Sequence, residues 1–322
     1  MTTAAPERTA GPGTGPPGDA GLPVVPARRP WRWAAGAAAL VLVAQFLHGL
    51  ATNPGWDWPT FRDHFATDTI LRAVGITLRL TFWATLLGFA LGAAVAALRL
   101  SRSAILRAIG WTYVWAFRSI PLIVQLVFWF NLSYLYRRFG LGIPFGPVLW
   151  EFDTVHALGA FGAAVLGLAL HQAAFAAEIV RAGVLAVDTG QSEAAAALGV
   201  PRLRQARRIV LPQAMRGILP NAANEIVSLF KATSVVHVMA IGELFHQVQA
   251  VYGRTGRVVP LLMVATAWYV LLTTLLSIGR YWIERHFARG ADRTPPPGPL
   301  QRARDLVRRI TENRPNPSGG PR

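Results

Sequence analysis

The stretch of residues 193–212 reads EAAAALGVPRLRQARRIVLP and interrupts a chain that is otherwise mostly apolar. Strong helix formers open it, Gly199 permits a sharp bend, and Pro201 suits the first turn of a second helix. The pattern predicts a helix, an elbow and a second helix that carries several arginines. The residues alone leave two interpretations open: a docking element for a partner protein, or a connector held on anionic lipid.

The rest of the chain has the composition of an integral membrane protein. Of its 322 residues, 52% are hydrophobic and only 15% are charged. Runs of about 18 or more nearly uncharged residues are long enough to cross a bilayer. We therefore expect an all-α, polytopic membrane protein with about six transmembrane helices. The predicted spans are residues 33–50, 74–98, 119–137, 157–180, 216–238 and 259–283.

The distribution of arginine predicts how these spans are oriented. A net charge of +16 is compatible with nucleic-acid binding, unless the cations lie where a membrane protein places them. With residue 1 in the cytoplasm, the inner segments hold 23 arginines and the outer segments hold five. This alternation follows the positive-inside bias. It predicts cytoplasmic termini and argues against nucleic acid as a partner.

Four regions follow from these patterns. Residues 1–30 and 290–322 are rich in proline, glycine or arginine and are predicted to be disordered. Residues 31–50 form an additional amino-terminal span ahead of a membrane domain at residues 70–285. Arginines before an apolar run also describe a cleaved secretory signal, but no good cleavage site follows the run. A retained anchor is therefore the preferred interpretation.

The opening stretch also resembles a known motif. Glu193-Ala194-Ala195, three residues, Gly199, nine residues, Ile209, one residue and Leu211-Pro212 have the spacing of the EAA motif in permease subunits of ATP-binding-cassette importers. Further matches are Ala177-Glu178 with Arg181, Gln213-Ala214, Leu219-Pro220, Asn224-Glu225, Lys231 with Thr233-Ser234, and Arg118-Ser119-x-Pro121-Leu122-x-x-Gln125-Leu126. Together they resemble the polar amino acid branch of this family, over about residues 70–285.

The resemblance implies a function and a set of partners. The loop at about residues 188–214 is then the coupling loop, whose first helix enters a cleft of a separate ATPase subunit. Other implied partners are an extracytoplasmic solute-binding protein, a second permease subunit that is identical or different, and the cytoplasmic membrane of a prokaryote. The implied substrate is a polar amino acid, and the alternative is another small polar solute. A secondary transporter would have no use for the docking loop.

Several chemistries find no support in the sequence. A phosphate-binding loop needs a lysine after a glycine, and the only lysine, Lys231, follows Phe230. ATP hydrolysis is therefore expected on another subunit, and the chain itself is not predicted to be an enzyme. Cysteine is absent and no two histidines are four residues apart, so neither a metal site nor a cofactor is predicted.

Polar residues recur at i, i+3, i+7 and i+10 along the predicted fifth span and give it one polar face. They are Asn221, Asn224, Ser228 and Lys231, with Glu225 beside them. An unpaired charge in a span costs at least about 2.5–3.5 kcal/mol. Glu225 and Lys231 lie about 240° apart around the helix, so they cannot pair with each other. We expect Asn224, Glu225, Lys231 and, on the third span, Gln125 to line a translocation path; the alternative is that they only hold helices together.

Three further features carry structural expectations. Gly88-x-x-x-Gly92 allows another helix to approach closely. Glu178 and Arg181, three residues apart on the fourth span, are expected to form a structural ion pair. Arg118 lies near a span end, and its side chain is expected to extend toward the membrane surface.

Overall fold

The computed structural model describes residues 30–142, 148–288 and 304. The chain divides into two compact units, of which the first ends at Trp56. Within this unit, α1 (Pro30–Thr52) is followed by the short helix η1 (Pro54–Trp56). Residues 34–52 of α1 are long and apolar enough to cross a membrane, so the additional span is helical as predicted. The predictions of disorder fall outside the described residues, apart from Pro30 and Arg304.

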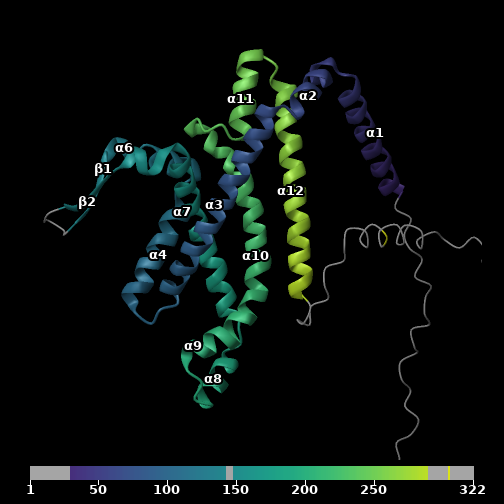
Figure 1. Ribbon diagram of the computed structural model, residues 1–322. Coiled ribbons are helices and arrows are strands. Elements are labelled where there is room, and N and C mark those ends of the chain that lie inside the picture. The colour runs from purple at the N-terminus through teal and green to yellow at the C-terminus, as the bar shows by residue number, and fades with distance from the viewer. Residues whose placement is uncertain (1–29, 143–147, 289–303, 305–322) are drawn as a thin grey trace, which may run out of the picture. The chain divides into compact units, whose positions relative to one another are not determined.

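The second unit, from Asp57 onward, is a bundle of helices with one small hairpin (Figure 1). Its elements are α2 (Trp58–Phe65), α3 (Asp68–Arg99), α4 (Ala104–Ser119), α5 (Leu122–Phe130), α6 (Leu132–Leu135), β1 (Arg138–Gly142), β2 (Val148–Asp153), α7 (Thr154–Leu185), α8 (Thr189–Ala197), α9 (Arg202–Gln205), the π-helical η2 (Ala206–Val210), α10 (Leu211–Ala232), the 3₁₀ helix η3 (Thr233–Met239), α11 (Leu244–Thr255) and α12 (Val258–Ala288). The antiparallel strands pair Leu141 with Trp150, and this hairpin is a feature that the all-helical prediction omitted.

Long apolar helices account for the membrane spans. Four helical stretches in the described residues are long and apolar enough: 34–52, 68–99, 159–185 and 258–287. Two bent helix pairs also pass when each is taken as one broken span. They are α4 with α5, bent by 102°, and the helices from Arg202 to Met239 with α11, bent by 47°. The prediction of an all-α membrane protein with about six spans is confirmed for these helices.

The third span differs from its prediction. Residues 119–137 were expected to form one helix, but the chain turns sharply between α4 and α5. Pro121 has no N–H and disfavours a helical conformation in the residue before it, and Ile120 is indeed extended (φ −89°, ψ 128°). Gln125 Nε2 donates to the carbonyls of Phe117 (2.8 Å) and Ile120 (2.7 Å). The bend is therefore fixed by hydrogen bonds at the end of α4.

Small residues bring α3 and α7 into close contact. A Cβ atom on Gly88 would lie 2.7 Å from Gln172 Cβ, and one on Gly92 would lie 2.5 Å from Ala176 Cβ. Both distances are too short for any side chain, so these two positions require glycine. The predicted close approach at the two glycines is confirmed, and α7 is the helix that uses it.

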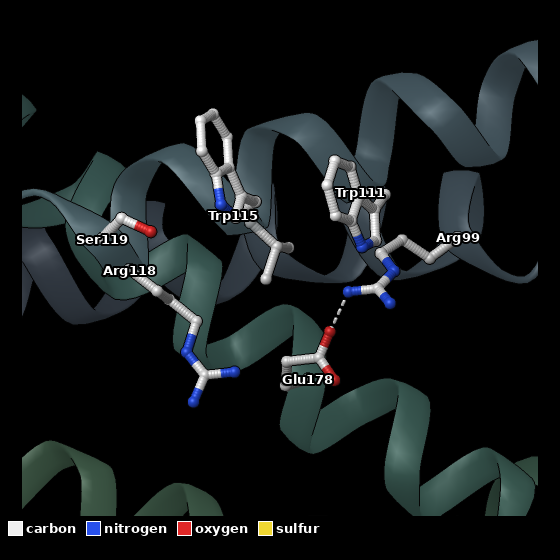
Figure 2. Close-up of a pocket in the computed structure, with 7 residues that line it drawn as sticks. Arg99, Trp111, Trp115, Arg118, Ser119 and Glu178 are labelled. Atoms are coloured by element: carbon white, nitrogen blue, oxygen red, sulfur yellow. Dashed lines mark hydrogen bonds and ion pairs between the residues drawn. The ribbon is translucent and has the colours of Figure 1, made fainter.

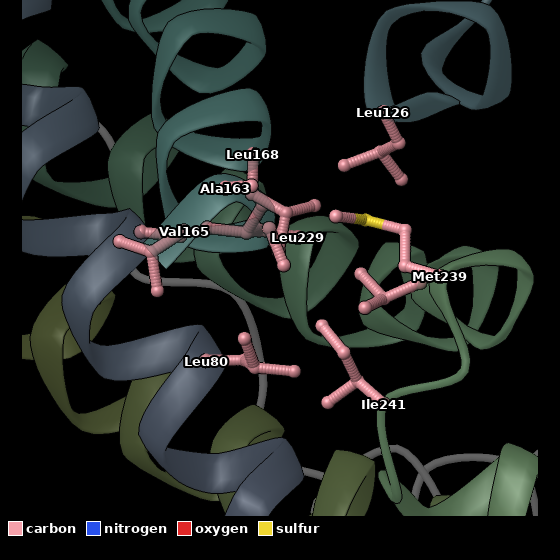
Figure 3. Packing of buried hydrophobic residues seen from close by; sticks show 11 residues of the cluster. Leu80, Leu126, Ala163, Val165, Leu168, Leu229, Met239 and Ile241 are labelled. Carbon is pink, nitrogen blue, oxygen red and sulfur yellow. The ribbon is translucent and has the colours of Figure 1, made fainter. Parts of the chain in front are cut away.

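The apolar core of the second unit lies where helices from distant parts of the sequence meet (Figure 3). Leu80 of α3, Leu126 of α5, Leu168 of α7, Leu229 of α10 and Met239 of η3 are buried in one cluster. The bent α4–α5 pair and the broken α10–η3 segment are thus both anchored on the α3–α7 pair.

A buried carboxylate closes the break between η3 and α11. Glu243 is fully buried and accepts hydrogen bonds from the backbone N–H of His246 (2.6 Å) and from the Tyr269 hydroxyl (3.3 Å). The next backbone N–H, that of Leu244, donates to Thr77 Oγ1 on α3 (3.0 Å). The start of α11 is therefore fastened to both α3 and α12.

Candidate functional site

The predicted elbow is present, and its geometry explains why it needs glycine. Gly199 has φ +71°, in the left-handed region that residues with a Cβ atom avoid. At the end of α8, the N–H of Gly199 donates to Ala196 O (3.0 Å), and the N–H of Val200 donates to Ala195 O (3.0 Å). These two bonds form a Schellman motif, a common way for a helix to end at a glycine. The helix–elbow–helix prediction is confirmed as a shape.

The second limb of the elbow continues into α10. Pro201 precedes α9, as expected of a residue that suits a helix start. The backbone then stays helical through η2, including its junction residues Gln205 and Leu211. The limbs are also joined by a side chain, because Gln205 Nε2 donates to Ser192 O (3.0 Å). The second limb of the elbow and α10 therefore form one continuous helical stretch.

The motif residues of this loop are mostly exposed. Glu193, Ala194, Leu211 and Pro212 are exposed, Ile209 is half-buried, and Ala195 is buried. Two apolar side chains beside the elbow are left uncovered: Leu198 is 83% exposed and Leu203 is 65% exposed. Both side chains are therefore free to contact another protein.

The polar face predicted for the fifth span lies on α10. Asn221, Asn224, Ser228 and Lys231 are exposed, and Glu225 is half-buried. The Asn224 amide oxygen accepts a hydrogen bond from the Arg280 guanidinium of α12. Glu225 interacts electrostatically with Arg118 of α4. Within the described part of the chain, the Lys231 ammonium has no hydrogen bond or ion pair.

Gln125, the remaining predicted path residue, is buried, unlike the polar face of α10. Its side chain is buried at the α4–α5 bend, where Nε2 also lies 3.2 Å from His171 Nδ1. The structure therefore shows a structural use for this residue. Its contact with a solute stays a prediction.

A hollow of about 450 Å³ opens between α3, α4 and α7 (Figure 2). Its lining residues are Arg99, Trp111, Val114, Trp115, Arg118, Ser119 and Glu178. Glu178 Oε2 accepts from Arg181 Nη2 (2.8 Å) and Nε (3.2 Å), which confirms the predicted pair. Glu178 Oε1 is paired with Arg99 of α3. Arg99 could not be predicted as the third member of this group, because it is distant from Glu178 along the chain and lies on a different helix.

Arg118 requires a correction. Its guanidinium was expected to extend toward the membrane surface, but it lies over the Phe175 ring of α7, 5.2 Å from the ring centre. It also interacts electrostatically with Glu178. The attraction of a cation for an aromatic face and for a nearby carboxylate explains why the side chain turns onto α7.

Taken together, the apolar spans and the bent helical loop define a multi-pass helical membrane protein of the permease class. The chain belongs to the family of binding-protein-dependent transport system inner membrane components, which matches residues 84–292. It is therefore an inner-membrane protein, and its resemblance to permease subunits of ATP-binding-cassette importers is confirmed.

Curated relatives cover much of the chain. The arginine transport system permease protein ArgU of Corynebacterium glutamicum is 39% identical over 84% of this chain and 84% of its own length. The nopaline transport system permease protein NocM of Agrobacterium fabrum is 33% identical over 70% of this chain and 92% of its own length. The arginine transport system permease protein ArtQ of Bacillus subtilis is 34% identical over 66% of this chain and 89% of its own length.

Solved structures share the fold. A chain of an amino acid ABC transporter crystallised with histidines aligns with a TM-score of 0.58 and 30% identity, over 68% of this chain and 94% of that chain. A chain of an inward-facing MetNI methionine ABC transporter aligns with a TM-score of 0.57 and 24% identity, over 70% of this chain and all of its own length.

Proposed function

We propose that this chain is the permease subunit of an importer that moves polar amino acids across the cytoplasmic membrane, driven by ATP hydrolysis on a separate subunit. Relatives named for arginine, nopaline and glutamine transport support an amino acid or a derivative as the substrate. The proposed coupling of ATP hydrolysis to the membrane spans rests on one observation: the α8–Gly199–α9 elbow has a second limb that is continuous with α10.

The partners follow from this arrangement. An ATPase subunit docks on α8, where the exposed Leu198 offers an apolar contact. The only lysine is in α10 and cannot serve a phosphate-binding loop, so the ATPase is a different protein. A solute-binding protein delivers the substrate from outside, and a second permease subunit completes the path. Both chain termini lie in the cytoplasm, as the arginine distribution predicts.

The polar face of α10 is the proposed lining of the path. An exposed amide, a half-buried carboxylate and an unpaired ammonium on one helix face are costly against lipid. A water-filled path or a second subunit removes that cost. Asn224, Glu225 and Lys231 are therefore placed where a passing solute contacts them, with Gln125 as a further candidate.

Reconstituted transport tests the proposal. The chain is purified with a matching ATPase subunit and binding protein and incorporated into liposomes, and uptake of radiolabelled L-arginine and L-glutamine is measured with and without ATP. We expect uptake of at least one of the two that requires ATP, the ATPase and the binding protein. Uptake by liposomes that contain this chain alone would contradict the proposal.

A single substitution tests the path. Glu225→Gln keeps the size of the side chain but removes its charge, so we expect uptake to fall about tenfold while the complex still assembles, a change of about 1.4 kcal/mol. Glu151→Gln is the matched control, because Glu151 lies in the β1–β2 hairpin, where it pairs with the exposed Arg138 at 3.5 Å. Normal uptake by Glu225→Gln would remove Glu225 from the path.

A further inference from the structure

The hollow between α3, α4 and α7 presents several hydrogen-bond donors that have no acceptor within the described residues. In Figure 2 both indole rings lie along one side of the hollow, with Arg118 and Ser119 at one end and Arg99 at the other. Within the described residues, no group accepts a hydrogen bond from either indole N–H, from the Arg118 guanidinium or from the Ser119 hydroxyl.

The one acidic group of the hollow is already occupied. Glu178 uses one carboxylate oxygen for Arg99 and the other for Arg181. Two guanidinium groups thus neutralise one carboxylate, and Arg118 adds a third cation without an ion-pair partner in the described chain. The hollow is therefore positively charged and rich in donors, so its chemistry suits an oxyanion.

The position of Arg118 indicates which oxyanion it receives. Arg118 is 14 residues from the start of α4, about 21 Å along the helix. With the inner end of α4 at the cytoplasmic surface, a lipid phosphate at that surface lies too far away. Arg118 also interacts electrostatically with Glu225, on the α10 face that we propose as the path. Through Arg118, the hollow is linked electrostatically to that face.

We propose that this hollow is a carboxylate-binding station on the translocation path, where Arg118, Trp111 and Trp115 receive the α-carboxylate of the amino acid in transit. The inference rests on the proposed function. Phe175 holds the Arg118 guanidinium in place by stacking against it. Glu225, of opposite charge, is suited to the ammonium group of the same zwitterion. All amino acids share these two groups, so the station recognises the class and leaves the choice of side chain to other contacts.

Direct binding to the purified complex tests this station. The permease–ATPase complex without its binding protein is placed in nanodiscs of phosphatidylcholine, and binding of L-arginine is compared with binding of agmatine, the same molecule without its carboxyl group. We expect agmatine to bind at least about tenfold more weakly, since a hydrogen bond to a charged group contributes about 1.5–3 kcal/mol. Arg118→Gln should weaken arginine binding about tenfold and leave agmatine binding unchanged.

Two variants control this experiment. Arg107→Gln lies on the same helix, and its guanidinium donates only to the carbonyls of Ser101 and Arg102; it should bind L-arginine within about twofold of the unsubstituted complex. Arg118→Lys keeps the charge but loses the planar guanidinium group. It should therefore bind L-arginine more tightly than Arg118→Gln and more weakly than the unsubstituted complex. A gel-filtration profile that matches the unsubstituted complex shows that Arg118→Gln is folded.

Three results would overturn the station. They are equal binding of L-arginine and agmatine, unchanged arginine binding by Arg118→Gln, and no arginine binding at millimolar concentration. In a further experiment, part of the phosphatidylcholine is replaced by phosphatidylglycerol. A loss of arginine binding in these nanodiscs would assign the hollow to a lipid phosphate instead. The proposed function is tested separately, by ATP-driven, binding-protein-dependent uptake by the unsubstituted complex. If that uptake is present, any of these results overturns the station alone.

Discussion

The α3–α7 contact and the α8 helix use small residues in opposite ways. Between α3 and α7, Gly88 and Gly92 are matched by Gln172 and Ala176, and the backbones approach until no side chain fits. On α8, alanines lie on a helix that is exposed apart from the half-buried Ser192 and the buried Ala195. Small residues therefore have two different structural roles in this chain. In the first region they complete a contact within the chain, and in the second they leave a smooth, exposed surface on which we propose that the ATPase subunit docks.

The largest expected effect breaks the completed contact. Gly92→Leu places a side chain where Ala176 Cβ is only 2.5 Å from the added Cβ. We expect a loss of about 3 kcal/mol or more of stability, or no folded protein, because the facing backbone cannot retreat. Gly75→Leu on the same helix is the control, since nothing lies within 4 Å of its Cβ position. Fluorescence-detected gel filtration after heating measures both; equal thermal stability would contradict the packing argument.

The next effect breaks the elbow without touching the core. Gly199→Pro fixes φ near −65°, whereas the native value is +71°, and it also removes the N–H that bonds to Ala196. We expect the chain to fold but to lose its ATPase subunit on co-purification, together with nearly all ATP-driven uptake. Gly217→Ala, in α10 with free space around it, should retain both. Full retention of the ATPase by Gly199→Pro would show that the bend is dispensable.

A third prediction concerns the ion cluster that joins α3 to α7. Glu178→Gln leaves Arg99 and Arg181 without their shared carboxylate. We expect a loss of about 1–3 kcal/mol of stability, the usual range for hydrogen bonds to charged groups. The thermal unfolding midpoint in detergent measures it, with Glu151→Gln as the control because the Arg138–Glu151 pair is exposed and 3.5 Å apart. An unchanged midpoint would mean that glycine packing alone holds these helices.

A substitution in the exposed loop should leave stability unchanged and weaken the binding of the ATPase subunit. Leu198→Ala removes a side chain that is 83% exposed, so the unfolding midpoint should stay within the equivalent of about 0.5 kcal/mol. Affinity for the ATPase subunit, measured by titration, should fall about tenfold or more if Leu198 is a central contact. A lower midpoint with unchanged affinity would identify Leu198 as part of the fold.

The smallest effect lies at the start of α2 and depends on pH. Asp57 caps α2; its hydrogen bond from the Thr60 hydroxyl (2.7 Å) and its pairing with Arg257 hold the pKa of the Asp57 carboxyl below its ordinary value of 3.8. The stabilisation is thus fully present above pH 3.8 and is lost as the pH falls through the lower native pKa. The midpoint difference between the unsubstituted chain and Asp57→Asn should be constant from pH 7 to 5 and vanish in stronger acid. A difference that persists there would exclude the charge as its cause.

Local sequence chemistry predicted the features that depend on neighbouring residues. The elbow follows from Gly199 and Pro201, the polar face of α10 from its period, and the Glu178–Arg181 pair from its spacing. Each of these needs only helix geometry and the conformational preferences of one or two residues.

Features that depend on contacts between distant segments could not be predicted in the same way. The addition of Arg99 to the Glu178 pair, the turn of Arg118 onto Phe175 and the partners of Gly88 and Gly92 arise from how α3, α4 and α7 pack. The α4–α5 bend is an intermediate case. Pro121 lies at the bend, but a proline is equally suited to the first turn of a helix, so its presence alone does not distinguish a bend from the start of a span.

The central claim is that α8 is a cytosolic contact for a separate ATPase, and cross-linking tests it most directly. Since the chain has no cysteine, Ala196→Cys on the exposed face of α8 gives a unique thiol, and Thr255→Cys at the end of α11 gives a matched control. We predict that a short cross-linker joins Ala196→Cys to the ATPase subunit and stops uptake, while Thr255→Cys forms no such link. Labelling of Ala196→Cys by a membrane-impermeant thiol reagent from outside intact cells would contradict the account.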